Sequence, residues 1–258
     1  MCTTCGCDHD HHHHDDDHHH KHEHAHDDKH SHNHKHEHRH DDAGKRTVIS
    51  IEEDILSKNN RLASFNRALF KEKGIFVLNL VSSPGSGKTS ILERTLHDLS
   101  DKIRFAVIEG DQQTDNDAQR IAATGVPVRQ INTGAGCHLD AHMIMHGTEG
   151  FNLDSLDILL IENVGNLVCP AAFDLGEHHK VAVLSVTEGE DKPLKYPQMF
   201  RNATVMLLNK TDLLPHIDFD VETCKGYARR VNPGIVIFEV SARSGEGMEE
   251  WYKWLTAG

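Results

Sequence analysis

No apolar stretch in the 258-residue sequence reaches the roughly 18 residues that a membrane-spanning helix needs. The N-terminus also lacks the positively charged segment and apolar core of a secretory signal peptide. The sequence therefore predicts neither a membrane span nor a signal peptide, and we expect a cytoplasmic protein without a membrane partner.

Positive charge is scarce. Lys and Arg together number 27 against 40 Asp and Glu, which gives a net charge of −13 when His is neutral. A nucleic-acid surface needs a basic stripe, so this balance argues against a nucleic-acid partner. An acidic chain is compatible with binding divalent cations.

Cysteine is also sparse, and three of the six cysteines, Cys2, Cys5 and Cys7, crowd the N-terminus. In a cytosolic chain such cysteines favour metal ligands over disulfides. Thiolates at this spacing can wrap one soft or borderline cation, such as Zn²⁺, Cu⁺ or Ni²⁺, and removal of Met1 would add the α-amine as a ligand. An unstructured, redox-sensitive tail is the alternative.

Histidine is abundant in one place: 17 of the 24 histidines lie in residues 1–40, alternating mainly with Asp, Glu and Lys. So polar a segment buries too little apolar surface to offset its ordering entropy. We therefore predict that residues 1–46 are a Cys/His-rich segment, disordered without metal, that stores or buffers several ions. A purification tag is the alternative, and the interleaved Asp, Glu, Lys, Ser, Asn and Arg argue against it.

Residues 47–258 are expected to form one folded domain. Ser50 and Glu53 make a capping-box pattern that predicts a helix start, and Gly74 predicts its end. Apolar runs at 75–81, 103–108, 128–131, 156–161, 180–186, 203–208 and 235–240 alternate with helical patterns, the last of them near 248–255. This alternation predicts an α/β fold with a mostly parallel sheet covered by helices on both faces.

The first of these runs leads into the segment Ser82-Ser-Pro-Gly-Ser-Gly-Lys-Thr-Ser90. A strand that turns through small residues into a helix points backbone N–H groups at an anion, which is the P-loop arrangement. Ser82 stands where Gly is usual, and a chance Gly-rich turn is the alternative. The residues predicted to bind the nucleotide are Pro84, Gly85, Ser86, Gly87, Lys88, Thr89 and Ser90, with Lys88 on the β/γ-phosphates and the Thr89 hydroxyl on Mg²⁺.

Carboxylates follow two of the predicted strands. Asp111, and as a second choice Asp117, come after the 103–108 run, and Glu162-Asn-Val-Gly165 follows the 156–161 run. Carboxyl ends of parallel strands lie beside the P-loop, so Asp111, Asp117 and Glu162 are predicted to approach Mg²⁺ and to move when the γ-phosphate leaves. Helix capping is the alternative for Asp111 and Asp117.

Two segments predict recognition of guanine. Asn209-Lys210-Thr-Asp212 follows one strand, and Ser241-Ala242-Arg243 follows another. The Asp212 carboxylate can accept hydrogen bonds from N1–H and the exocyclic amine of guanine, whereas adenine would leave it unpaired. We therefore expect GTP as the nucleotide, and slow intrinsic hydrolysis because no arginine finger or positioning glutamine is evident.

A second metal site is predicted inside the folded domain. Cys137 and His138 are expected at the start of a helix on which His138, His142 and His146 share one face, and Cys169 lies beyond Glu162. Thiolate and imidazole suit both Ni²⁺ and Zn²⁺. An inert, buried Cys169 is the alternative.

In combination, these motifs resemble the HypB family of nickel-incorporation GTPases that act in hydrogenase maturation, over about residues 47–258 and in the N-terminal segment. The resemblance implies a P-loop GTPase of the signal-recognition, MinD and BioD class that dimerises through its nucleotide faces. It also implies delivery of Ni²⁺ to the hydrogenase large subunit, with a HypA-like partner.

Carried over to this sequence, the resemblance implies that Cys137, His138 and Cys169, with His142, bind the metal at the dimer interface. It also makes Lys195 a candidate to reach the nucleotide of the partner subunit. Two other functions stay open: a urease-directed nickel GTPase, and a metal-storage protein whose nucleotide domain serves only oligomerisation.

Overall fold

The computed structural model describes residues 42–112 and 115–257. Its chain divides into two units, residues 1–52 and 53–258. The predicted ligands Cys2, Cys5 and Cys7 and the histidine-rich tract lie outside the described residues.

The first helix, α1, spans Asp42–Lys73. The predicted start at Ser50 is therefore wrong, because a capping box marks a helix start only where the preceding chain is not helical, and here the helix already runs from Asp42. The predicted end is confirmed: Gly74 adopts φ +66°, a left-handed conformation that favours glycine.

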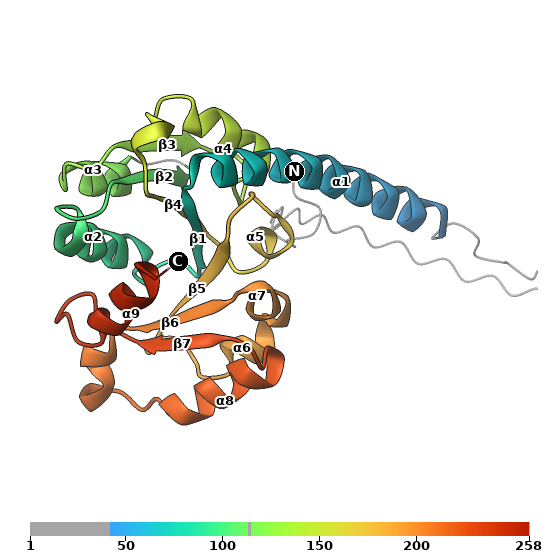
Figure 1. The fold of residues 1–258 in the computed structure, drawn as a ribbon. Coiled ribbons are helices and arrows are strands. Elements are labelled where there is room, and N and C mark those ends of the chain that lie inside the picture. The colour runs from blue at the N-terminus through green and yellow to red at the C-terminus, as the bar shows by residue number, and fades with distance from the viewer. Residues whose placement is uncertain (1–41, 113–114, 258) are drawn as a thin grey trace, which may run out of the picture. The chain divides into compact units, whose positions relative to one another are not determined.

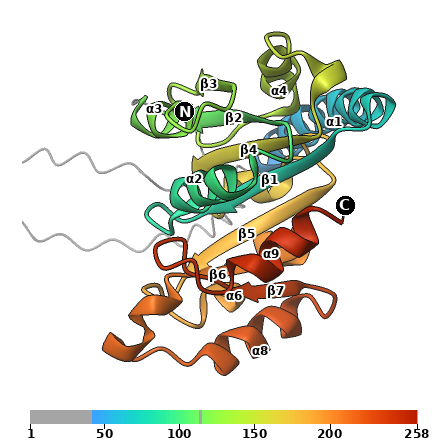
Figure 2. The same ribbon diagram turned by 60° about the vertical axis from the view of Figure 1, so that its left-hand side comes forward.

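Seven parallel strands form one sheet in the order β3-β2-β4-β1-β5-β6-β7 (Figures 1 and 2). This confirms the predicted α/β class and parallel sheet. The strand bounds are β1 Phe76–Ser82, β2 Phe105–Asp111, β3 Val128–Asn132, β4 Ile158–Gly165, β5 His179–Ser185, β6 Val205–Asn209 and β7 Val236–Glu239.

Helices cover both faces of the sheet (Figures 1 and 2). Residues of α2, α3 and α9 share one buried cluster with the sheet, and residues of α1, α4, α5, α7 and α8 belong to the clusters on the other face. The remaining bounds are α2 Lys88–Leu99, α3 Asn116–Ala122, α4 Ala141–Thr148, η1 Leu153–Ser155, α5 Cys169–Ala172, α6 Lys192–Lys195, α7 Pro197–Asn202, η2 Thr211–His216, α8 Val221–Val231 and α9 Met248–Leu255.

The central strand β1 shows why its sequence is almost continuously apolar. Leu78 and Leu80 pack in the cluster with α2 and α9, whereas Val77 and Val81 pack on the opposite face. A strand buried on both faces has no solvent side to mark with polar residues. Since all strands run in parallel, their carboxyl ends meet at one edge of the sheet, where the P-loop begins.

Two strands are longer than predicted. The apolar runs indicate strand ends at residues 108 and 161, but β2 continues through Glu109 to Asp111 and β4 continues through Glu162 to Gly165. These polar residues are paired in the sheet, so polarity alone misplaced the ends. The Glu162-Asn-Val-Gly165 motif is therefore part of a strand.

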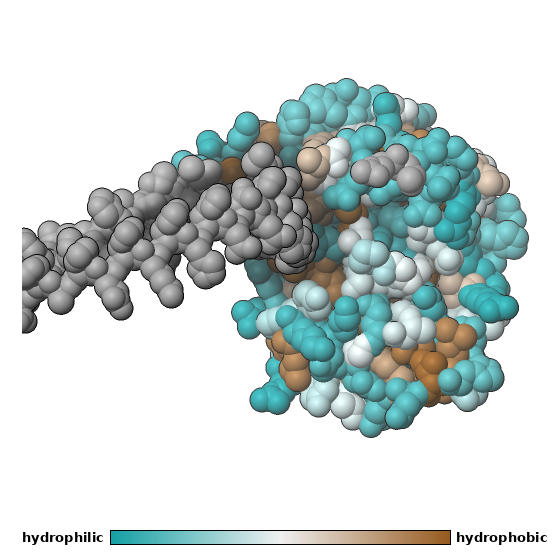
Figure 3. All heavy atoms as spheres, turned by 180° about the vertical axis from the view of Figure 1, so that it is seen from behind, coloured by the Kyte–Doolittle hydropathy of each residue, from teal (hydrophilic) through white to brown (hydrophobic). Residues whose placement is uncertain are grey.

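No helix in the described ranges is long and apolar enough to cross a membrane. Figure 3 shows a mostly hydrophilic surface on the face behind that of Figure 1, with hydrophobic residues in a few separate groups. The large apolar side chains that remain exposed among the described residues are Ile55, Phe65, Val168, Leu194 and Val236.

Candidate functional site

The P-loop connects β1 to α2 in the conformation that an anion cradle requires. Gly85 and Gly87 have φ values of +75° and +96°, and Gly87 is the N-cap of α2. The Ser86 hydroxyl lies 2.7 Å from the carbonyl of Ser83 and 2.9 Å from Glu188 Oε1, and it can donate its one proton to either. These internal bonds hold the turn, so its backbone N–H groups and the start of α2 are preorganised for phosphate.

Lys88 explains the unusual residue at the start of the motif. Its Nζ donates to Ser82 Oγ at 2.8 Å, and that hydroxyl in turn donates to the Ser83 carbonyl. Burial lowers the pKa of Lys88, an effect that the neighbouring carboxylates, first Glu162, oppose. The Ser82 side chain therefore gives the buried ammonium a polar partner beside the phosphate cradle.

Thr89 lies against the strand carboxylates. Its Oγ1 donates to Glu162 Oε1 at 2.7 Å, and Glu162 is paired in register with Glu109 on the neighbouring strand. Oε2 of each glutamate is buried and has no hydrogen-bond partner among the described residues. A hydroxyl and two carboxylates are the hard oxygen ligands that Mg²⁺ takes, so these residues fit that ion.

Glu109 was not among the carboxylates predicted to lie at this site. Burial raises its pKa to about 8, and the Glu162 carboxylate adds to the shift. Burial likewise raises the pKa of Glu162 to about 7, opposed by Lys88. The sequence offers one indication of its position, because Glu109 directly follows a buried apolar run. Side chains alternate along β2, so Glu109 lies on the same face as Val107, toward α2.

The two predicted aspartates lie in different settings. Asp111 is the last residue of β2, and its Oδ1 accepts the N–H of Gln112 at 2.7 Å. Asp117 lies in α3, where its carboxylate is 3.1 Å from Arg120. Their roles as Mg²⁺ ligands stay predictions, and Arg120 already provides Asp117 with a cationic partner.

A cavity of about 240 Å³ opens beside the P-loop. Asn209, which lines this cavity, joins the P-loop to the segment after β7. Its Nδ2 donates to the Ser86 carbonyl at 2.9 Å, and its Oδ1 accepts the N–H of Ala242 at 3.2 Å. Lys210 has a left-handed φ of +66°, and its Nζ donates to the Gly85 carbonyl at 2.7 Å. The cavity lining comprises Gly87, Ser90, Asn209, Lys210, Asp212, Leu213, Ala242 and Arg243, of which Leu213 was not predicted.

Asp212 is held at this cavity by Ser241. The Ser241 hydroxyl donates to Asp212 Oδ1 at 2.6 Å and accepts the N–H of Ser244 at 3.1 Å. The two segments predicted to recognise guanine therefore meet in space, although 29 positions separate these residues in sequence.

Cys137, His138 and Cys169 form a candidate metal group. Their ligand atoms all lie within 4.8 Å of one another, and Cys137 Sγ lies 3.6 Å from His138 Nδ1. Cys169 is the first residue of α5, whereas Cys137 and His138 precede α4. Burial lowers the pKa of His138, which favours the neutral imidazole that binds metal. Two thiols and an imidazole suit Ni²⁺ and Zn²⁺.

The predicted helix face with three histidines is partly wrong. Because α4 begins at Ala141, His138 lies before the helix and shares no face with His142 and His146. His142 and His146 do share a face, with their Nε2 atoms 3.1 Å apart. His142 is not a member of the three-residue group. Sequence spacing could not reveal that Asp140, whose carboxylate accepts the N–H of Met143, is the N-cap.

Lys195 lies in α6 with its side chain 62% exposed, and its Nζ is 2.7 Å from Asp191. An exposed lysine at the end of a short helix is accessible to a second molecule. Its predicted contact with the nucleotide of a partner subunit stays a prediction.

Comparison with known proteins shows the family of the chain. The CobW/HypB/UreG nucleotide-binding domain model matches residues 76–239. The hydrogenase maturation factor HypB of Azotobacter vinelandii is 69% identical over 210 residues, which cover 81% of this chain and 69% of that protein. The chain belongs to the HypB family of hydrogenase maturation factors. As a member of this P-loop NTPase family, it is a nucleotide-binding protein.

Other HypB proteins give the same result. HypB of Escherichia coli K12 is 64% identical over 211 residues, covering 82% of this chain and 73% of that protein. The crystal structure of HypB from Archaeoglobus fulgidus superposes with a TM-score of 0.73 at 41% identity, covering 78% of this chain and 98% of that chain. HypB from Helicobacter pylori in complex with nickel superposes with a TM-score of 0.74 at 40% identity, covering 78% and 94%.

Proposed function

We propose that this HypB family member is a cytoplasmic, GTP-hydrolysing nickel chaperone that delivers Ni²⁺ to the hydrogenase large subunit precursor. One observation carries the proposal. Strand β4 bears Glu162, which contacts the P-loop Thr89, and Cys169 of the metal group lies seven residues after Glu162 in the sequence. A change at the phosphates therefore has a short covalent path to the metal ligand.

GTP is the proposed nucleotide because of Asp212. Its carboxylate faces a cavity that Asn209 and Lys210 connect to the P-loop. Guanine offers N1–H and the exocyclic amine as a pair of donors to such a carboxylate, and adenine offers no such pair. A buried polar group left unpaired disfavours the wrong base.

Hydrolysis would use the residues around Thr89. Lys88 would neutralise charge on the β/γ-phosphates, and the Thr89 hydroxyl, with the carboxylates of Glu162, Asp111 or Asp117, would hold Mg²⁺. The ion would supply charge neutralisation on the transferred phosphoryl group. In this scheme, GTP or GDP sets the position of Glu162, and hence of the segment that leads to Cys169.

Nickel would be held as cargo by Cys137, His138 and Cys169, and Zn²⁺ is a competing ion for the same ligands. We infer that GTP favours a homodimer through the nucleotide-facing surface. Val168 beside Cys169 and Leu194 beside Lys195 are both exposed apolar side chains, 52% and 38%, in segments that follow β4 and β5. Burying such side chains would favour association at this edge.

A HypA-like chaperone is the expected partner in nickel transfer, and Cys2, Cys5, Cys7 and the histidine-rich tract would load or store the metal. Urease is a second candidate acceptor. The protein named hydrogenase/urease maturation factor HypB from Helicobacter pylori J99 is 42% identical over 212 residues, covering 80% of this chain and 86% of that protein.

Activation of a purified, nickel-free hydrogenase large subunit precursor tests the proposal. The full-length protein, loaded with Ni²⁺, is added with GTP or GDP, in parallel with the Lys88→Ala and Cys169→Ser variants. We expect activation with GTP only, and its loss in both variants. Equal activation by Lys88→Ala would instead indicate a metal-storage protein. In a parallel assay with apo-urease, activation of urease but not of the precursor would indicate the second acceptor.

A further inference from the structure

A chain of buried polar side chains lies on the face of the sheet opposite the P-loop helix α2. Its members are Asn163 on β4, Asn79 on β1, Glu177 in the loop before β5 and Lys180 on β5. All four are nearly or fully buried. Groups of this kind are costly to bury unless they are hydrogen-bonded, so the partners that they choose carry structural information.

This series of polar side chains begins next to the P-loop. Glu162 and Asn163 are consecutive residues of β4, so their side chains point to opposite faces of the sheet. Glu162 contacts Thr89 on one face, and Asn163 Nδ2 donates to Asn79 Oδ1 at 3.2 Å on the other. The Asn163 Oδ1 accepts the N–H of Leu139 at 3.1 Å, one residue after His138.

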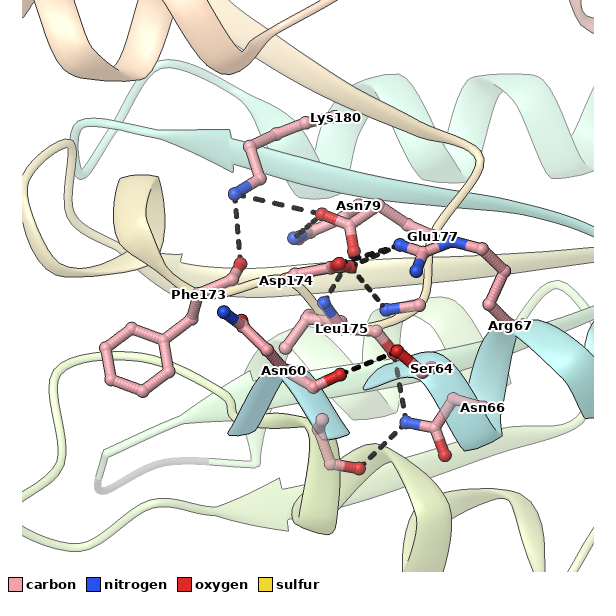
Figure 4. A network of polar contacts seen from close by, with 12 residues as sticks. Asn60, Ser64, Asn66, Arg67, Asn79, Phe173, Asp174, Leu175, Glu177 and Lys180 are labelled. Carbon is pink, nitrogen blue, oxygen red and sulfur yellow. Dashed lines mark hydrogen bonds and ion pairs between the residues drawn. The ribbon is translucent and has the colours of Figure 1, made fainter. Parts of the chain in front are cut away.

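The chain continues to β5. Asn79 Nδ2 donates to Glu177 Oε1 at 3.1 Å, and the same carboxylate oxygen lies 3.8 Å from Lys180 Nζ (Figure 4). Glu177 Oε2 accepts the N–H of Leu175 at 2.6 Å. The partners on both sides therefore determine the amide orientation of Asn79 and of Asn163. Turning either amide by 180° would bring two donors or two acceptors together.

Lys180 ends this series of polar contacts at the segment that follows Cys169. Its ammonium donates to the carbonyls of Pro170 at 2.8 Å and Phe173 at 3.0 Å, and lies 3.3 Å from that of Ala171. These three residues follow Cys169 in the chain. The Phe173 ring in turn packs on the His138 ring with centroids 3.9 Å apart.

We propose that Lys180 is the positioning residue of the metal group, and that Asn163, Asn79 and Glu177 connect it to the nucleotide-contacting strand. The ammonium draws the carbonyls of the α5 segment inward and so fixes the Cys169 thiol against Cys137 and His138. Asn163 fixes the segment that contains His138 through its hydrogen bond with Leu139. The inference rests on the proposed function of the metal group, and it adds the residues that set its geometry.

The helix α1 makes separate hydrogen bonds to the two segments that follow His138 and Cys169. Asn59 Oδ1 accepts the N–H of Ala141, and its Nδ2 donates to the Asp174 carbonyl, at 2.9 and 2.8 Å. Asn66 Nδ2 donates to the carbonyls of both Ala141 and Leu175, at 2.8 and 3.0 Å. Because these bonds do not involve Lys180, a substitution of Lys180 should shift the Cys169 segment without unfolding the domain.

The test follows thiolate-to-nickel charge transfer on titration of the full chain with Ni²⁺, in a background with Cys2, Cys5 and Cys7 changed to Ser. Imidazoles of the histidine-rich tract give no such band, and the Cys224 thiol is buried with its pKa raised to about 12. We expect Lys180→Met to weaken nickel binding by about 10- to 100-fold, the usual cost of losing an outer-sphere partner, and to reduce the band intensity at saturation. Nucleotide binding should be unchanged.

Lys180→Arg should recover part of the affinity, because a guanidinium can still donate to the carbonyls. The matched control is Lys225→Met, which removes a lysine paired with Glu222 and Glu239 on α8 and β7 and should leave the band unchanged. If Lys180→Met fails to fold, Asn163→Asp replaces it, since it keeps the acceptor for Leu139 but cannot donate to Asn79. Wild-type affinity and spectrum in Lys180→Met, or in Asn163→Asp where it replaces it, would overturn the inference.

The Cys137→Ser variant separates the two hypotheses. If it weakens or abolishes the band while Lys180→Met does not alter it, the positioning role alone is wrong. If Cys137→Ser leaves the band intact, the metal group itself is wrongly assigned, and the inference falls with it.

Discussion

The hydroxyl of Thr89 donates a 2.7 Å hydrogen bond to Glu162, which joins the first turn of the P-loop helix to the carboxyl end of β4. A Mg²⁺ ion bound by the hydroxyl would compete for the same oxygen atoms. This contact is therefore the point at which the nucleotide site and the strand that leads to the metal group meet.

Glu162→Gln should slow GTP hydrolysis by about 100-fold, the order of effect expected for one preorganised electrostatic group in a transition state. The amide keeps the shape and the acceptor for Thr89 but loses the negative charge. GTP affinity should change by no more than a few-fold. Single-turnover hydrolysis and equilibrium binding measure both quantities, with Glu246→Gln, an exposed glutamate, as the control. Unchanged turnover would contradict a role for Glu162 in hydrolysis.

Asp212→Asn should weaken GTP binding by about 10- to 100-fold, because one charge-assisted hydrogen bond is lost and a donor faces the guanine amine. The same variant should gain affinity for XTP, whose 2-oxo group accepts from the new amide. Competition binding with GTP, XTP and ATP checks this. Unchanged relative affinities for GTP, XTP and ATP would show that Asp212 does not contact the base.

Gly87→Ala should abolish nucleotide binding and destabilise the fold, since an added Cβ would lie 2.4 Å from Asn209 Nδ2 in a left-handed backbone conformation. Gly85→Ala is the matched control. It has a similar positive φ, but its Cβ would meet nothing within 4 Å, so we expect a loss of stability of only about 1 kcal/mol. Thermal unfolding and GTP binding compare the two variants, and equal effects would contradict the contact with Asn209.

The stability of the nucleotide-free protein in EDTA should fall as pH rises from about 5 to 8. Burial raises the pKa of Glu162 to about 7 and of Glu109 to about 8, so the folded state binds more protons than the unfolded state in this range. Deprotonation therefore favours unfolding. Urea unfolding across this range should show a flatter dependence for the Glu109→Gln, Glu162→Gln double variant. An identical slope would show that these carboxylates titrate normally.

The features that the sequence predicts most directly are local. The P-loop, the two segments predicted to recognise guanine and the helix Met248–Leu255 depend on residues a few positions apart, and the helix is found as predicted. Its Trp251 is buried in the core. Local patterns of this kind carry their own geometry.

The sequence did not predict the residues whose position depends on pairing between distant segments. Glu109 becomes a site residue only because β2 pairs with β4 in the register that aligns it with Glu162. The role of Lys180 likewise depends on β5 lying beside β1, which puts it near Asn79. The apolar run before Glu109 indicates only a buried carboxylate, and the sequence around Lys180 does not indicate its partners. The start of α4 was also misplaced, because a cap at Asp140 and not the histidine spacing determines it.

The most direct test of the account is the nickel affinity of the full-length protein, with Cys2, Cys5 and Cys7 changed to Ser, in the presence of GDP and of a non-hydrolysable GTP analogue. Thiolate-to-nickel charge transfer reports the Cys137, His138 and Cys169 group. The account predicts different affinities in the two states, since a nucleotide shifts the metal site only through differential binding. Equal affinities would contradict GTP-gated nickel delivery.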